Sequence, residues 1–445
     1  MTSLAATALI FATLAQTPFP AGQPTPDVVS LARAALDAMA AADFAKIEAQ
    51  FTGEMKAALP PGKLAAGWAT VQQQAGAFKR CGSEPRVVTI ADKQMVITPC
   101  EFERATVNVQ FAFDSAGRIA GMAMRPDVKP APSYTLPPYA NAASFSEREI
   151  TIGSGEWTLP ATLAVPAGAG PWPAVVLVHG SGPNDRDETV GANKPFKDLA
   201  TGLASRAIAV LRYDKRTKVH GAKLATVKEF TVKEEVVDDV LEAVKTLRAQ
   251  QGIDPRRVFV LGHSLGGMLI PRIGTADPTI AGLIVLAGPA RPLEEAIVAQ
   301  TRYLADADGK ISPDEETALE QVATVADSVR ALKPEDGTSG RMIFNAPASY
   351  WLDLRGYHPP SEAKHVRQPM LILHGERDYQ VTMEEFARWK AAIGSRPDVT
   401  FHSYPTLNHL FIAGTGPSLP AEYQVPGHVA EDVVRDIAAW IVRPR

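Results

Sequence analysis

Short apolar segments alternate with amphipathic ones from about residue 145 to the C-terminus, and this alternation constrains the fold more than any other feature. Pro173–Gly180 reads PAVVLVHG, a nearly continuous apolar run typical of a strand covered on both faces. Val232–Gln250 spaces its apolar residues as an amphipathic helix does. Repeated strand–helix units give a parallel sheet with helices on both faces. We therefore expect an α/β domain with a mostly parallel sheet over residues 145–445.

One segment, at about residues 290–365, interrupts this alternation. It has mostly helical character and includes Tyr350 and Trp351. In α/β sheets, ligands bind beyond the carboxyl ends of the strands, and this insertion follows such a strand. We therefore expect a helical cap over the site.

The first part of the chain has a different pattern. Residues 25–125 begin with helical spacing and continue with strand-like alternation, which predicts a small α+β domain. The proline-rich residues 126–144 are expected to be a linker. Residues 1–20 contain an apolar run that is too short to span a bilayer and has the length of a secretory signal, although no Lys or Arg precedes Arg33. We expect a periplasmic or secreted protein.

Composition narrows the function classes. The 445 residues carry a formal charge of −4 at pH 7 without a basic stripe, which argues against nucleic-acid binding. No segment after the leader is apolar enough to span a membrane. The histidines include no His-Glu-x-x-His pattern, which argues against a zinc hydrolase, and we expect an enzyme without a metal or another cofactor. Cys81 and Cys100 lie in one β-rich stretch, and the sequence leaves open whether they form a disulfide or remain buried thiols.

The sequence Gly-His-Ser-Leu-Gly at residues 262–266 follows an apolar strand and precedes a helical segment. This context is the one required of a nucleophile elbow, a turn so sharp that side chains at both glycine positions would collide with the neighbouring backbone. The turn holds the serine hydroxyl clear of the sheet, beside a helix N-terminus that favours developing negative charge. We therefore predict that Ser264 is a nucleophile.

A serine nucleophile needs a base, and an acid should orient that base. Asp378 follows the strand that ends in LILHGER, and His409 follows the strand VTFHSYP, in the chain order serine, acid, histidine. We predict that His409 is the base and that Asp378 is its partner. The alternatives are Glu376 for the acid, an N-cap role for Asp378, and, for the base, the less well placed histidines His402 and His428.

The loop after the strand Pro173–Gly180 consists of small residues whose backbone N–H groups can approach a substrate oxygen. We predict that the N–H groups of Leu265 and Ser181 form an oxyanion hole, with Gly182 as the alternative to Ser181. Two charge clusters, Asp185–Asp187 and Arg212–Arg216, follow strand ends. We interpret them as ion pairs that brace the site rather than as cleft-lining residues.

Several segments together resemble one bacterial α/β-hydrolase family, whose members are described as serine-aminopeptidase-like or dienelactone-hydrolase-like and often act as carboxylesterases. The segments are HGSGPNDRDE, LRYDKRT, GHSLGG, LILHGERDYQVT and LNHLF. True dienelactone hydrolases have a cysteine nucleophile where this chain has Ser264. Residues 35–124 are similar to a domain of unknown function with a nuclear-transport-factor-2-like fold. The resemblance implies an α/β-hydrolase fold, the triad Ser264, Asp378 and His409, export in many members, and a homodimer formed through either domain.

These observations predict a carboxylic ester hydrolase that acts on a small-molecule ester through an acyl-serine intermediate. The helical insertion and the loop Leu410–Gln424 are expected to shape the acyl pocket. The alternative is a serine peptidase of the same fold, although the charged cluster with which such peptidases often fix a peptide terminus is not assignable in the sequence.

Overall fold

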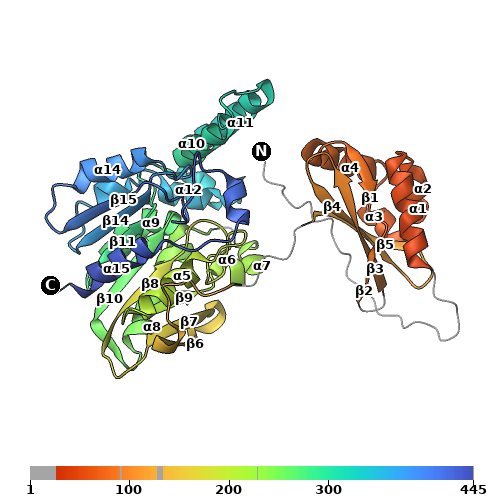
Figure 1. The fold of residues 1–445 in the computed structure, drawn as a ribbon. Coiled ribbons are helices and arrows are strands. Elements are labelled where there is room, and N and C mark those ends of the chain that lie inside the picture. Colours follow the sequence, from red (N-terminus) through yellow and green to blue (C-terminus); the bar gives the residue numbers. More distant parts are fainter. Residues whose placement is uncertain (1–26, 91–92, 128–133, 228, 444–445) are drawn as a thin grey trace. The chain divides into compact units, whose positions relative to one another are not determined.

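The computed structural model describes residues 27–90, 93–127, 134–227 and 229–443 (Figure 1). The chain divides into two compact units between Ala131 and Pro132. Residues 1–20, expected to be a signal peptide, lie outside the described residues. Within the described ranges, no helix has both the length and the apolar character needed to cross a bilayer.

The N-terminal unit packs helices against an antiparallel sheet (Figure 1). Burial alternates along the central strand, so that Val107, Val109, Phe111 and Phe113 face the helices. The α+β character expected of this region is therefore present. Its helices are α1 (Val28–Ala40), α2 (Phe44–Glu48), α3 (Gly53–Ala58) and α4 (Lys63–Ala75). Its strands are β1 (Phe78–Cys81), β2 (Arg86–Ile90), β3 (Lys93–Phe102), β4 (Thr106–Phe113) and β5 (Ile119–Pro126).

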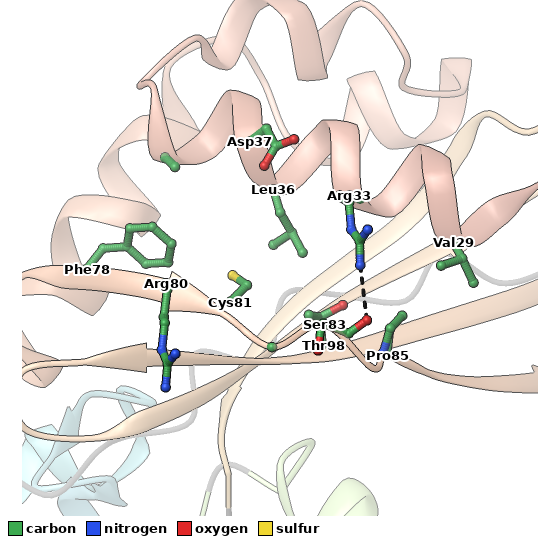
Figure 2. A pocket seen from close by; sticks show the side chains of 12 residues that line it. Val29, Arg33, Leu36, Asp37, Phe78, Arg80, Cys81, Ser83, Pro85 and Thr98 are labelled. Carbon is green, nitrogen blue, oxygen red and sulfur yellow. Dashed lines mark hydrogen bonds between the residues drawn. The ribbon is translucent and has the colours of Figure 1, made fainter.

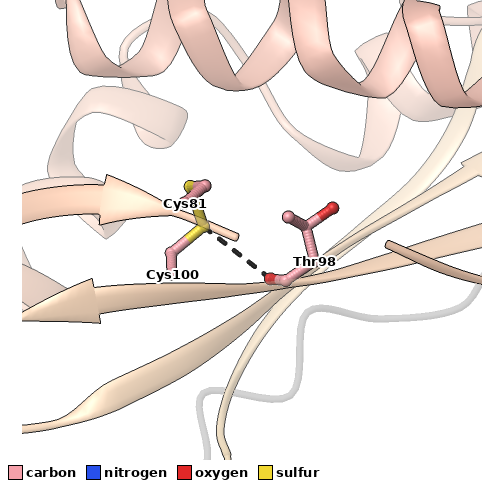
Figure 3. Close-up of a disulfide and its surroundings, with 3 residues drawn as sticks. All are labelled: Cys81, Thr98 and Cys100. Carbon is pink, nitrogen blue, oxygen red and sulfur yellow. Dashed lines mark hydrogen bonds between the residues drawn. A yellow bond between two sulfur atoms is a disulfide. The ribbon is translucent and has the colours of Figure 1, made fainter. Parts of the chain in front are cut away.

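A disulfide ties two strands of this unit together. Cys81 of β1 lies opposite Cys100 of β3 in the antiparallel register, and their sulfur atoms are bonded (Figure 3). Of the two states that the sequence left open, the structure has the disulfide.

A hollow of about 430 Å³ lies beside this disulfide, between α1 and the first strands (Figure 2). Arg33 of α1 spans part of it and donates a hydrogen bond to the carbonyl of Ser83. The residues that line the hollow include none of the predicted catalytic residues.

Part of the stretch expected to be a linker, residues 126–144, packs on the C-terminal unit. The Tyr139 hydroxyl donates to the carbonyl of Val429, and the Tyr134 hydroxyl donates to Asp198. These contacts attach residues 134–139 to the C-terminal unit, whereas β5 of the N-terminal unit extends to Pro126.

The C-terminal unit is built on an eight-stranded sheet in the order β15-β14-β11-β10-β8-β9-β7-β6. Neighbouring strands from β9 to β15 along this order are parallel, and β6 and β7 add an antiparallel edge, so the sheet is mostly parallel as expected. The strands are β6 (Phe145–Ile152), β7 (Leu159–Pro166), β8 (Trp172–Val178), β9 (Ala209–Tyr213), β10 (Ile253–His263), β11 (Leu283–Leu286), β14 (Met370–Gly375) and β15 (Val399–Tyr404).

Helices cover both faces of this sheet and create two apolar cores (Figure 1). Along β10, Val258 and Val260 belong to one core, and Phe259 and Leu261 belong to the other. The near-continuous apolar strands follow from this double burial. One face is covered by α8 (Asp238–Arg248), α9 (Leu265–Ala276) and α14 (Met383–Ile393), and the other by α5 (Pro195–Ala204) and α15 (Glu431–Val442). Shorter elements are α6 (Arg216–Val219), α7 (Gly221–Leu224), the π-helical turn Lys233–Val237, and the 3₁₀ turns Ala142–Ser144, Gly155–Trp157 and Pro420–Gln424.

The insertion expected at residues 290–365 lies between β11 and β14. Its long helices form an antiparallel hairpin that extends away from the sheet (Figure 1). A capping box between Ser312 and Glu315 starts the second of these helices. The insertion contains α10 (Leu293–Ala305), α11 (Pro313–Arg330), the 3₁₀ turn Pro334–Thr338, β12 (Met342–Ile343), β13 (Ala346–Pro347), α12 (Ala348–Leu354) and α13 (Pro359–Glu362).

Candidate active site

Ser264 lies on a sharp turn between β10 and α9, with φ 51° and ψ −117°. A non-glycine residue rarely adopts a positive φ, so the surrounding packing must hold it there. A Cβ atom at Gly262 would lie 2.3 Å from the carbonyl oxygen of Gly266, and one at Gly266 would lie 2.4 Å from that of Val178. The crowding predicted from the sequence is therefore present at both glycine positions.

The loop after β8 lies directly against this turn. A Cβ atom at Gly180 would be 3.1 Å from Cβ of Ser264 and 3.6 Å from its Oγ. Ser181 follows Gly180, and Leu265 is the first residue of α9. The structure thus brings together the two segments from which oxyanion donors were predicted.

Asp378 and His409 form a buried hydrogen bond. His409 Nδ1 lies 2.6 Å from Oδ2 of Asp378, and both side chains are at most 4% exposed. The other carboxylate oxygen of Asp378 accepts the backbone N–H groups of Gln380 (2.8 Å) and Val381 (2.9 Å). This division of the two oxygens fixes the carboxylate and leaves the Nε2 edge of His409 for proton exchange.

His409 contacts the elbow through His263, the residue that precedes Ser264. The rings of His263 and His409 are 4.6 Å apart between centroids, and His263 Nε2 lies 2.9 Å from the carbonyl oxygen of His409. In the part of the chain that the structure describes, no hydrogen bond joins Ser264 Oγ to His409. Such contacts are often longer in unliganded enzymes than in their substrate complexes.

The alternative acid and bases occupy other places. Glu376 accepts a hydrogen bond from Ser403 on an exposed surface. His402 lies 3.9 Å from Asp436, and His428 lies 3.1 Å from the buried Asp198. The N-cap of α14 is Thr382, so Asp378 does not fill that position.

The site contains a second buried carboxylate–imidazole contact, between Glu188 and His263, which was not predicted from the sequence. Glu188 Oε2 lies 2.9 Å from His263 Nδ1, although the two atoms are not aligned for a hydrogen bond. Burial alone lowers the pKa of His263, but the Glu188 carboxylate outweighs it and holds this pKa above its usual value. Burial likewise raises the pKa of Glu188, and the charge of His263 outweighs it and lowers that pKa. Both directions favour a charged pair.

The charge clusters brace the region, as interpreted from the sequence. Arg186 pairs with Asp214 at 2.9 Å and also with Glu149. Arg212 pairs with Asp187 at 2.9 Å and with Glu147 at 2.7 Å.

An aromatic cluster joins the insertion to the loop after His409. Tyr303 of α10 stacks on Tyr379 at 5.4 Å, and Tyr379 stacks on Tyr423 at 6.4 Å. Leu410 packs in the same cluster. Because Tyr379 follows Asp378 and Leu410 follows His409, this cluster is adjacent to the predicted catalytic residues. Among the residues described, no group of three or more His, Cys, Asp or Glu side chains is arranged to hold a metal ion.

Comparison with known families agrees with this geometry. A family described as serine aminopeptidase, S33, matches residues 171–414, which is more than half of the chain. The chain belongs to this family of serine hydrolases. Within the S33 family domain lie the elbow, the loop after β8 and the Asp378–His409 pair. A family of unknown function, DUF3887, matches residues 32–122 of the N-terminal unit.

This chain is similar over most of its length to esterase EstD of Thermotoga maritima. The two are 39% identical over 392 residues, covering 88% of this chain and 90% of the relative. Among solved structures, the esterase domain of a Rhodothermus marinus protein is 17% identical, with a TM-score of 0.41, covering 66% of this chain and 97% of that one. Est1E from Butyrivibrio proteoclasticus is 16% identical, with a TM-score of 0.42, covering 66% and 98%.

Proposed function

We propose that this enzyme hydrolyses carboxylic esters of small molecules through a covalent acyl intermediate on Ser264. The observation that carries the proposal is the buried His409–Asp378 hydrogen bond beside a serine held at positive φ. The 39% identity to an esterase over most of both chains supports the ester as the substrate class.

In this mechanism, His409 Nε2 takes the proton of Ser264 as Oγ attacks the ester carbonyl carbon. The tetrahedral intermediate collapses, its carbon–oxygen bond to the alcohol breaks, and His409 returns the proton to the departing alkoxide. A water then attacks the acyl-serine, with His409 again taking a proton, and the carboxylic acid and free Ser264 are released. Asp378 holds the imidazole in the Nδ1–H tautomer and stabilises its charged form.

The negative oxygen of each tetrahedral intermediate is assigned to the N–H groups of Leu265 and Ser181. The start of α9 supports the first donor because the first N–H groups of a helix have no partner within the helix. The contact between Gly180 and Ser264 supports the second donor. Loss of one such donor typically costs about 2.7–4 kcal/mol of transition-state stabilisation.

Kinetics with p-nitrophenyl acetate and butyrate test the proposal. Ser264→Ala should lower kcat by about 10⁴-fold or more, because the nucleophile is removed while the fold is kept. Ser403→Ala, which removes a hydroxyl bonded to exposed Glu376, is the matched control and should keep wild-type kinetics. A fluorophosphonate probe should label the wild type and not Ser264→Ala. An alanine variant as active as the wild type contradicts the mechanism.

The family description also suggests aminopeptidase activity as a second candidate. Hydrolysis of aminoacyl-naphthylamides with a higher kcat/KM than that of the esters identifies a peptidase with the same nucleophile. The two candidates therefore differ in substrate, and Ser264→Ala abolishes both activities.

A further inference from the structure

Gly180, which lies against Ser264, is held at both of its backbone polar groups by buried charged side chains. Its N–H donates to Glu188 Oε1 at 2.6 Å, and its carbonyl accepts a hydrogen bond from Lys215 Nζ at 2.8 Å. Asn184 adds a longer bond of 3.2 Å to the same carbonyl. Burying each of these charges carries a large desolvation cost, so each must be paired or hydrogen-bonded.

Lys215 is itself fixed by partners on other elements. Its Nζ lies 2.8 Å from Oε1 of Glu235, and the two side chains are 2% and 6% exposed. Glu235 lies in the π-helical turn before α8, and its Oε2 accepts a hydrogen bond from Tyr350 of α12 at 2.8 Å. The Lys215 ammonium is therefore held by Gly180 and Glu235, and Tyr350 of the helical insertion holds Glu235 in turn.

The position of the Lys215 ammonium determines the orientation of the peptide group between Gly180 and Ser181. The carbonyl of Gly180 and the N–H of Ser181 belong to one planar, trans peptide group, so they point in opposite directions. A lysine that fixes the carbonyl also fixes where the N–H of Ser181 points. The ion pair itself adds little net stability over apolar residues of similar volume, so its main consequence is geometric.

We propose that Lys215, with Glu188 on the opposite side of Gly180, is a positioning residue that aims the Ser181 N–H at the substrate oxygen. This inference rests on the proposed function, since it assigns a role within the same oxyanion hole. Lys215 touches neither the substrate nor the reacting atoms, and it acts only through the Gly180–Ser181 peptide.

The test compares Lys215→Met with the double variant Lys215→Met/Glu235→Gln. The single variant leaves Glu235 buried without its cation, so it also loses stability. The double variant removes that uncompensated charge, while the amide oxygen of the introduced glutamine still accepts the hydrogen bond from Tyr350. Arg216→Met is the matched control, because it breaks the neighbouring buried pair with Asp239 and leaves Gly180 untouched.

The measurements are kcat and KM for p-nitrophenyl acetate, the inhibition constant of phenylboronic acid, and Tm. Phenylboronic acid forms a negative tetrahedral adduct on the serine and so reports on the oxyanion hole, whereas KM reports mainly on ground-state binding. We expect kcat of both Lys215 variants to fall by about 10–100-fold, which is at most about the loss caused by removing one oxyanion donor. KM should stay within about threefold of the wild-type value. Boronate affinity should fall in parallel with kcat. The double variant should recover Tm but not kcat.

Wild-type kcat and boronate affinity in the folded double variant overturn the inference. An equal loss of kcat in Arg216→Met does so as well, because it attributes the effect to lost stability. A wild type that lacks Ser264-dependent esterase activity and fluorophosphonate labelling overturns the proposed function instead. The two failures are therefore distinguishable.

Discussion

At the scale of single residues, the two oxygens of Asp378 have separate partners, and this division predicts the effect of a conservative change. In Asp378→Asn, the amide oxygen can keep the two backbone N–H donors of Gln380 and Val381, so the amide NH₂ group faces His409. His409 Nδ1 must then accept, which puts the proton on Nε2, the atom that should receive the serine proton. We expect kcat to fall by about 10⁴-fold. Ester kinetics measure this fall in kcat, and an unchanged circular dichroism spectrum shows that the fold is kept. A decrease in kcat of less than about tenfold contradicts the role assigned to Asp378.

His179 predicts a pH dependence of stability. It is buried between Phe196 and Tyr213, and burial lowers its pKa to about 4 from an ordinary value near 6.5. Between these values the unfolded chain binds the proton and the native protein does not, so stability increases with pH. This contribution is complete above about pH 6.5 and is lost progressively as the pH falls toward about 4.

Thermal melts at about pH 4.5 and pH 7 measure this effect in the wild type and in His179→Gln, which keeps a donor for the carbonyl of Asp185. The wild type should lose more Tm on acidification than the variant does. Equal losses assign the acid sensitivity to other groups.

The residues that could be predicted from the sequence are those whose chemistry depends on local pattern. Ser264 lies between two glycines after a strand, and Asp378 and His409 follow strand ends, so each could be located without knowledge of its neighbours. Glu188 and Lys215 could not be assigned in this way. Their charge is ordinary in a loop, and only tertiary packing makes it buried and directed at Gly180. The sequence feature that could have indicated Glu188 and Lys215 is their position in the loops that follow apolar strands.

At the scale of elements, the strands and principal helices followed from apolar periodicity, whereas irregular geometry did not. The segment expected to be one amphipathic helix, Val232–Gln250, begins with a π-helical turn at Lys233–Val237, where Glu235 turns toward Lys215. Strand β10 also begins earlier than the apolar run suggests, because Ile253 pairs with Trp172 before a register shift. Side-chain spacing carries no information on such local changes in hydrogen bonding.

The contact between α10 and the loop after His409 predicts a change in substrate preference. Tyr303 and Leu304 of the insertion both pack in the cluster with Tyr379 and Tyr423, and the ring of Tyr303 stacks on that of Tyr379. Tyr303→Ala removes its ring and opens space beside the predicted catalytic residues. We expect the ratio of kcat/KM for p-nitrophenyl octanoate over that for the acetate to rise by about 3–10-fold, within the range of a few buried methylene groups.

Thr301→Ala, on the same helix, removes a hydroxyl that donates to the carbonyl of Ile297. It is the control and should leave the ratio unchanged. If the ratio of kcat/KM values stays constant in Tyr303→Ala, α10 does not line the acyl pocket.

At the scale of the whole molecule, the division into two units predicts that stability and activity respond separately to one cross-link. The Cys81–Cys100 disulfide closes a loop with a sequence separation of 19 residues in the N-terminal unit, whereas Ser264, Asp378 and His409 lie in the C-terminal unit. Chain entropy gives about 3 kcal/mol for a loop of this size. Cys81→Ala/Cys100→Ala should therefore lower the unfolding free energy of the N-terminal unit by about that amount, and kcat/KM for esters should stay within about twofold of wild type.

Calorimetry of the double variant should show the transition of one unit moving to lower temperature while the other keeps its Tm. The isolated C-terminal unit, residues 132–445, identifies which transition belongs to it and should keep the ester kinetics of the full chain. If esterase activity instead disappears at the temperature where the N-terminal unit unfolds, the catalytic unit depends on its neighbour for its active geometry.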